Sequence, residues 1–184
     1  MGRVRVYLGC SLDGCIAGPE HDLSFLHAPE LVDGDSGPND GGLSFEAFLE
    51  DVGALLMGRR TYQVLLDHDA WPYGPRPVLV ASHHPLPAAP QGGDARRVEG
   101  SVAELVRQAQ EAAGGRDVYL DGGELVRQGL EAGVVDELCL TILPLVLGRG
   151  IRLWDGLQSR TDLQFGPPAT VRRMIQLTAQ VRRA

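Results

Sequence analysis

Three positions in the sequence combine glycines, arginines and hydroxyls in a way that could bind an anion. They are Gly58-Arg59-Arg60-Thr61, Ser82 and Gly122-Gly123-Glu124, and each follows or closes a short apolar run. A glycine turn that opens a helix lets backbone N–H groups approach a phosphate closely. Arginines add bidentate anion donors, and the hydroxyls of Thr61 and Ser82 add further hydrogen bonds.

Each of these positions has a simpler interpretation when it is taken alone. Glycines between strands and helices are usually only turns, and Arg59-Arg60 is also typical of a solvated helix start. Three such positions on successive strand ends favour a phosphate-rich ligand such as a dinucleotide, with simple turns kept as the alternative. Neither the Rossmann fingerprint nor the P-loop occurs in the sequence, so the ligand would be held without them.

The surrounding pattern predicts the elements that would position these residues. Apolar runs alternate with amphipathic segments, and two alternating segments without a helix between them end the chain. This order predicts one domain over residues 1–184, with a three-layer α/β fold, a mostly parallel central sheet and antiparallel C-terminal edge strands. The predicted strands are Val4–Cys10, Ala54–Met57, Pro77–Ser82, Asp117–Leu120, Val135–Pro144, Thr170–Met174 and Gln176–Arg182. Helices are predicted after Ser44, over Arg59–Asp67, from Ser101 to Ala113 and over Glu124–Ala132.

Composition excludes several classes of function. The 184 residues carry a formal charge of −7, which argues against a nucleic-acid binder. All 17 cationic residues are arginine, so lysine Schiff bases and P-loop lysines are excluded. Cys10, Cys15 and Cys139 lack metal-ligand spacing, so we expect no metal site and a reduced, cytoplasmic protein. No apolar run reaches the roughly 18–20 residues of a membrane span.

Several segments, in order along the chain, match one known family. They are Ser11–Gly18, Leu56–Tyr62, Val80–Ser82, Asp121–Gly123, and Gly133–Leu138 followed by Pro144, Gly148 and Gly150. With these segments the chain resembles the dihydrofolate-reductase-like superfamily, and within it the family related to the reductase domain of bifunctional riboflavin biosynthesis enzymes. The zinc deaminase signature of those enzymes does not occur here, so a two-step role within this chain is excluded.

The resemblance implies an NADPH site and assigns residues to its parts. The adenosine 2′-phosphate side is assigned to the segment that begins at Gly58, with Ser82 at its side, and the pyrophosphate to the glycine pair and the helix start after it. Ile16 and Ala17 match the backbone beside the nicotinamide carboxamide. Asp13 matches an aspartate near the nicotinamide and is the candidate catalytic residue, although Asp-Gly is equally a turn pair. The implied cofactor-binding residues are Ile16, Ala17, Gly58, Arg59, Arg60, Thr61, Ser82, Gly122, Gly123, Glu124 and Leu125.

These residues predict an NADPH-dependent reductase that transfers a hydride to a C=N, C=O or C=C bond of a small heterocyclic or carbonyl substrate. Its pathway would be riboflavin- or pteridine-related or a specialised one, and the segment His21–Gly42 would cover the substrate. The resemblance also implies a homodimer, with the terminal strands or residues 148–154 near the interface.

The alternative is a non-catalytic ligand- or dinucleotide-binding protein on the same fold. Glu124 would place a carboxylate near the pyrophosphate, and the first helix offers only Glu46 and the preceding Asp40 as substitutes for the acid that binds the pterin in folate reductases. His83 and His84 could contact phosphate, but we prefer to interpret them as exposed loop residues.

Overall fold

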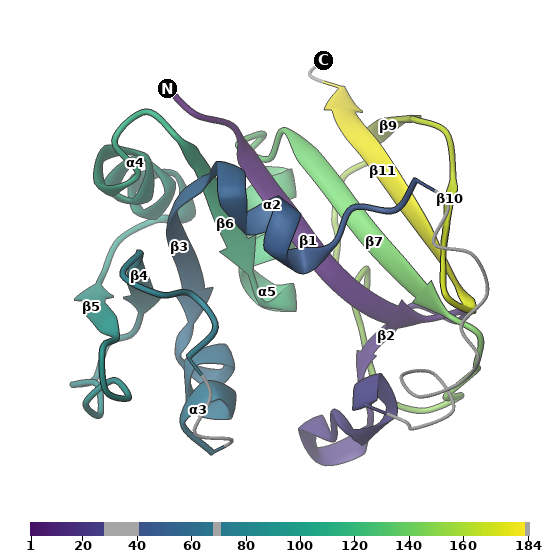
Figure 1. Ribbon diagram of the computed structural model, residues 1–184, viewed down its shortest axis with the longest axis horizontal. Helices are drawn as coiled ribbons and strands as arrows, with labels where there is room; N and C mark the ends of the chain where they lie inside the picture. Colours follow the sequence, from purple (N-terminus) through teal and green to yellow (C-terminus); the bar gives the residue numbers. More distant parts are fainter. Residues whose placement is uncertain (28–40, 68–70, 183–184) are drawn as a thin grey trace.

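The computed structural model describes residues 1–27, 41–67 and 71–182, and in this part of the chain one nine-stranded sheet dominates (Figure 1). Its strand order is β10-β11-β7-β1-β6-β3-β4-β5, and β9 also pairs with β11, on the edge away from β7. A two-stranded sheet, β2-β8, lies apart from it. The strands are β1 (Val4–Ser11), β2 (Cys15–Ala17), β3 (Val52–Gly58), β4 (Pro77–Ala81), β5 (Asp94–Val98), β6 (Asp117–Asp121), β7 (Glu137–Leu143), β8 (Ile151–Arg152), β9 (Asp162–Phe165), β10 (Ala169–Val171) and β11 (Met174–Arg182).

The pairing confirms the predicted mixed sheet. Strands β5, β4, β3, β6, β1 and β7 run parallel to their neighbours, whereas β11 pairs antiparallel with β7, β9 and β10. All the predicted strands are present, with ends that differ by a few residues at most. Because the parallel strands share a direction, the segments that follow β3, β4 and β6 emerge at one edge of the sheet.

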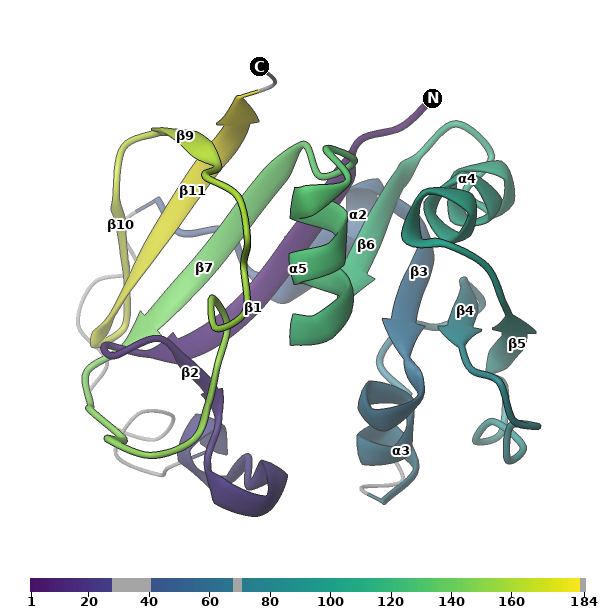
Figure 2. The same cartoon turned by 180° about the vertical axis from the view of Figure 1, so that it is seen from behind.

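The helices form two layers, one on each face of the sheet (Figures 1 and 2). The α-helices in the described residues are α2 (Phe45–Asp51), α3 (Arg59–Asp67), α4 (Val102–Ala112) and α5 (Gly123–Glu131). Residues of α2 and α3 pack in one apolar core with Leu55, Val78 and Tyr119, and residues of α4 and α5 pack in the other with Val6 and Leu120. The predicted three-layer arrangement is therefore confirmed.

Local signals set where the helices begin. The Ser44 hydroxyl accepts a hydrogen bond from the N–H of Ala47 at 3.1 Å, which caps α2. The Ser101 hydroxyl and the carboxylate of Glu104 form a complete capping box at the start of α4. These caps explain why the sequence predicts both helix starts correctly.

Four strands were not predicted, for two different reasons. β5 carries Arg96 and Arg97 and lies at the edge of the sheet, so its composition is polar. β2 and β8 are only three and two residues long, and they pair across more than a hundred residues of sequence. β9 is a four-residue outer strand against β11. Such strands exist through their partners and leave little periodicity in the sequence.

The segment between β1 and α2, which includes the predicted substrate cover His21–Gly42, has short elements in its first half. They are β2 and two one-turn 3-10 segments, η1 (Pro19–His21) and η2 (Ser24–His27). Residues 28–40 lie outside the described part of the chain. No helix in the described ranges is long and apolar enough to cross a membrane.

Candidate functional site

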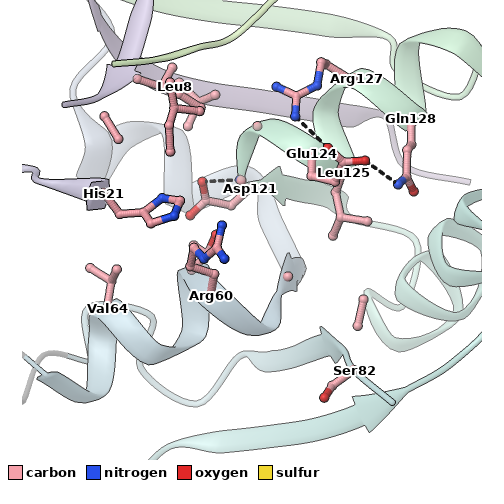
Figure 3. Close-up of a pocket in the computed structure, with 18 of the residues that line it drawn as sticks. Leu8, His21, Arg60, Val64, Ser82, Asp121, Glu124, Leu125, Arg127 and Gln128 are labelled. Atoms are coloured by element: carbon pink, nitrogen blue, oxygen red, sulfur yellow. Dashed lines mark hydrogen bonds and ion pairs between the residues drawn. The ribbon is translucent and has the colours of Figure 1, made fainter. Parts of the chain in front are cut away.

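A cavity of about 660 Å³ opens at the carboxyl ends of β3, β4 and β6 (Figure 3). The register explains this position, because Gly58 pairs with Ala81 and Met57 pairs with Asp121 across neighbouring parallel strands. In open α/β sheets, ligands bind beyond the carboxyl ends of the strands. The structure therefore gathers the three segments that the sequence singled out around one cavity.

The cavity wall includes every predicted cofactor-binding residue except Arg59. The lining also includes the apolar side chains of Leu8, Leu23 and Leu26, and Ser82, His83 and Glu99, which follow β4 and β5. The predicted residues that line it are Ile16, Ala17, Gly58, Arg60, Thr61, Ser82, Gly122, Gly123, Glu124 and Leu125.

The glycine pair between β6 and α5 lies in a confined space. Gly122 has a φ of +92°, and a Cβ at this position would lie 2.6 Å from Oγ1 of Thr61. A Cβ on Gly123 would lie 2.4 Å from Cδ1 of Ile16. At Gly58, by contrast, a Cβ would meet nothing within 4 Å. The glycines at these positions leave the backbone at the cavity wall without side chains, so a phosphate could approach it closely.

The structure separates the two predicted arginines. Arg60 lines the cavity, whereas Nη1 of Arg59 donates to the Pro85 carbonyl at 2.7 Å and to Oγ of Ser82 at 3.3 Å. The Ser82 hydroxyl, which is buried, in turn donates to the carbonyl of His84 at 2.9 Å. Arg59 therefore stabilises the loop after β4 and lies beside the cavity, next to Ser82.

Glu124 is held away from the glycine pair by its own helix. Its carboxylate accepts a hydrogen bond from Nη2 of Arg127 at 2.6 Å and one from Nε2 of Gln128 at 2.8 Å. The Arg127 hydrogen bond, with that of Gln128, lowers the pKa of the carboxyl. Its charge is thus compensated by a neighbouring cation, which weakens the expectation that it would repel a pyrophosphate.

Asp13 lies outside the cavity wall. Its carboxylate accepts hydrogen bonds from the Ser11 hydroxyl at 2.6 Å, the N–H of Leu147 at 3.1 Å and the N–H of Gly148 at 2.9 Å. These bonds, led by that of Ser11, lower its pKa to about 2. Such contacts join the turn after β1 to the loop after β7, and the catalytic role of Asp13 stays a prediction without a contact to the cavity.

Asp121 is a buried acid of the cavity wall, and in the sequence it stands out only as part of the Asp121–Gly123 motif. Its side chain comes from the last position of β6 and is buried, with 9% of the residue exposed. Burial raises the pKa of its carboxyl to about 6, although the N–H of Gly122, 2.7 Å from Oδ1, and the Tyr119 hydroxyl act in the opposite direction. A polar residue that ends the apolar run Val118–Leu120 was the signal for it. An acid with this pKa can hold or release a proton near neutrality.

His21 is a second cavity residue that the sequence analysis did not assign. It lines the cavity from η1, and in Figure 3 its imidazole points into the same part of the cavity as Asp121 and Arg60. These three side chains come from a 3-10 turn, a strand and a helix that are far apart in the sequence. In the described part of the chain, no group of three or more His, Cys, Asp or Glu residues could hold a metal ion.

Comparison with known proteins gives a family match over nearly the whole chain. The family model described as the RibD C-terminal domain matches residues 3–177. One curated relative, the uncharacterized protein YwjB of Bacillus subtilis, is 29% identical over 181 residues, which are 95% of each chain.

Three solved structures show the same fold. The structure named "putative riboflavin biosynthesis protein" from Shewanella sp. PV-4 is 30% identical, with a TM-score of 0.81 over 98% of this chain and 99% of that one. A Thermotoga maritima deaminase and 5-amino-6-(5-phosphoribosylamino)uracil reductase is 13% identical, with a TM-score of 0.67 over 98% of this chain and 57% of that one. Dihydrofolate reductase from Enterococcus faecalis, complexed with NADP(H), is 16% identical, with a TM-score of 0.59 over 99% and 98%. The predicted dihydrofolate-reductase-like fold is confirmed.

Proposed function

The chain belongs to the RibD C-terminal domain family, and from this premise we propose that it is an oxidoreductase that uses NADPH to reduce a small molecule. One observation carries the proposal. A cavity at the carboxyl ends of β3, β4 and β6 combines glycines at two helix starts, arginine and hydroxyl donors, and a buried acid. A dinucleotide needs the first two features, and a reduction that consumes a proton needs the third.

The residues present fit a bound nicotinamide dinucleotide. The starts of α3 and α5, with Thr61, Gly122 and Gly123, would hold the pyrophosphate, since both helix N-termini border the cavity. Ser82, flanked by Arg59, would take the adenosine 2′-phosphate, and Ile16 with Ala17 would meet the nicotinamide. When bound, the reduced nicotinamide supplies a hydride. The protein's own task is to orient the substrate, exclude water and supply a proton.

We propose Asp121 as a source of that proton. Its Oδ1 accepts the N–H of Gly122, so Oδ2 is the atom that carries a proton when the carboxyl is neutral. Because burial raises the pKa to about 6, both the acid and its conjugate base are populated near neutral pH. We further propose a pyrimidine as the substrate class, on the name of the Thermotoga relative, and 5-amino-6-(5-phosphoribosylamino)uracil as the first compound to assay.

Replacing Arg59 with alanine is expected to weaken NADPH binding by about 30-fold while NADH binding changes less than threefold. Arg59 lies beside Ser82, so its loss removes a charge-assisted contact worth about 1.5–3 kcal/mol, and only NADPH carries the 2′-phosphate. Titration of the protein with each nucleotide, followed by nicotinamide fluorescence, measures both affinities. Arg107→Ala is the matched control, because Arg107 pairs with Glu111 on the exposed face of α4.

Two results of this titration would count against the proposal. If the wild-type chain binds neither nucleotide, the oxidoreductase assignment is wrong. If it binds NADPH but does not oxidise it in the presence of any compound from a panel of pyrimidines and pterins, the alternative of a non-catalytic dinucleotide-binding protein gains support. The salt bridge of Glu124 with Arg127 weakens one of the two arguments for that alternative.

We also propose that the chain forms a homodimer through the β7–β11 side of the sheet. Large apolar side chains are exposed there, among them Trp154, Phe165 and Ile175, and a second cavity of about 290 Å³ with an apolar wall lies between Trp154, Phe165 and the sheet. Light scattering is expected to give the mass of two chains, and Phe165→Glu is expected to give the mass of one. A single-chain mass for the wild type would contradict the dimer.

A further inference from the structure

The η1 turn holds two consecutive non-glycine residues in the left-handed region. Glu20 has a φ of 56° and His21 a φ of 67°. Such conformations cost about 1–3 kcal/mol each and persist where the surrounding structure imposes them. Here Gly18 N–H donates to the Asp22 carbonyl at 2.7 Å, and Asp22 N–H donates to the Pro19 carbonyl at 3.1 Å. The turn is thus closed at both ends, and its strain falls on the two residues between.

The next residues fix the direction in which the turn leaves β2. The carboxylate of Asp22 accepts hydrogen bonds from the Ser24 N–H at 3.0 Å and the Ser24 hydroxyl at 2.8 Å. On the other side, Ala17 pairs with Ile151 in the small sheet. A relaxed backbone at His21 would point its side chain elsewhere, so the strained conformation is what directs the imidazole toward the cavity.

The imidazole enters the cavity where polar and apolar side chains meet. Asp121 and Arg60 face His21 from β6 and α3, and Leu8, Leu23 and Leu26 are apolar members of the cavity wall (Figure 3). A small polar group bound between His21 and the buried Asp121 would therefore be partly shielded from solvent, and hydrogen bonds there are stronger than in water.

We propose that His21 is a catalytic residue that contacts the substrate and donates a hydrogen bond to the heteroatom of the bond being reduced. This inference rests on the proposed oxidoreductase function and deepens it. When a hydride adds to the carbon of a C=O or C=N bond, the π electron pair moves to the oxygen or nitrogen. That atom then takes a proton, so an N–H bond of the protonated imidazole breaks as an O–H or N–H bond forms. The imidazole recovers its proton from Asp121 or from solvent.

The proposal narrows the substrate class. A donor at this position stabilises charge that develops on oxygen or nitrogen, and it has no acceptor to bind if both atoms of the double bond are carbon. Arg60, a cation that also lines the cavity, adds to the preference for an electronegative atom. The site therefore selects small polar molecules with a C=O or C=N bond over those with an isolated C=C bond.

The placement of His21 is tested without turnover by following the histidine side chains with ¹H–¹⁵N NMR. The chain has five histidines, and the variants His21→Gln and His83→Gln assign the two that line the cavity. The probes are NADP⁺ and 2′,5′-ADP, which lacks the nicotinamide. NADP⁺ is expected to shift the resonances of both residues, whereas 2′,5′-ADP is expected to shift His83 alone.

The outcomes of this comparison separate the proposed role of His21 from the proposed cofactor site. If His83 shifts and His21 does not respond to NADP⁺, the role of His21 is wrong while the cofactor site stands. A shift of His21 with 2′,5′-ADP would place it at the adenosine end and would also overturn the role. If neither histidine responds to either probe, the dinucleotide site itself is wrong, and with it the inference.

Donation to the substrate is tested by two substitutions that differ in one property. His21→Phe keeps an aromatic ring without a donor and is expected to lower kcat with 5-amino-6-(5-phosphoribosylamino)uracil by about 100-fold. His21→Gln keeps a donor and is expected to recover part of that loss, with the Kd for NADPH within threefold of wild type in both. His27→Phe, on an exposed residue at the end of η2, is the matched control. Equal activity of the Phe variant and wild type would overturn the proposal. If the wild type does not reduce this compound, the NMR comparison alone tests the placement of His21.

Discussion

Gly122→Ala is expected to lower the affinity for NADPH by about 100-fold, the largest effect of any single substitution that we predict on binding. The φ of +92° at this position is unfavourable for alanine, and the added Cβ would lie 2.6 Å from Oγ1 of Thr61. Relief of that contact moves the β6–α5 turn away from the start of α3. The backbone N–H groups of the two helix starts can then no longer bind the pyrophosphate together. Each charge-assisted hydrogen bond that is lost lowers the binding free energy by about 1.5–3 kcal/mol.

Gly115→Ala is the control variant that separates the backbone conformational cost of an alanine from its effect on cofactor binding. Gly115 has a φ of +91°, and a Cβ there would meet nothing within 4 Å. The two alanine variants therefore carry a similar conformational penalty, measured as a loss of unfolding free energy, but only the one at Gly122 borders the cavity. Isothermal titration of both variants with NADPH gives the comparison. Equal affinities would show that the glycine pair is only a turn.

Arg5→Met is expected to lower the free energy of unfolding by about 3 kcal/mol, the largest stability effect that we predict. Arg5 is 5% exposed, and its Nε lies 2.6 Å from Oε1 of Glu137, which is 4% exposed. Its Nη1 also lies 3.4 Å from Oδ2 of Asp117, and its guanidinium packs over the ring of Phe48. Removing the cation leaves the carboxylates of Glu137 and Asp117 with fewer positive partners. Arg3 and Gln180 still bind Glu137.

Urea unfolding of three further variants tests this explanation. The double variant Arg5→Met with Glu137→Leu removes both buried charges and is expected to regain most of the lost stability. Arg107→Ala removes one member of an exposed pair and is expected to change the stability by less than about 1 kcal/mol. The NADPH affinity should not change in any of them, because β1, β6 and β7 begin at the edge of the sheet opposite the cavity. A double variant as unstable as Arg5→Met would indicate lost packing as the cause.

Much of the fold and the general position of the site could be predicted from the sequence because they depend on short-range patterns. Apolar runs marked the buried strands, and Ser44 and Ser101 marked helix starts through caps that act over three residues. The strand-helix alternation then required a mostly parallel sheet, and parallel strands place Gly58, Ser82 and Gly122 at the same edge. The type of each residue was sufficient to predict anion-binding chemistry there.

Only the tertiary structure decided which side chains meet and what each one does. Adjacent residues on a helix point in different directions, so Arg60 enters the cavity while Arg59 braces the loop after β4. Asp13 and Asp121 are both followed by glycine in the sequence, yet one joins two loops and the other is buried in the cavity wall with a raised pKa. The orientation of His21 depends on a strained turn, and contacts made by residues outside the turn hold it in place. Local patterns determine elements and their order, whereas burial, pKa and side-chain direction depend on neighbours that come from distant parts of the chain.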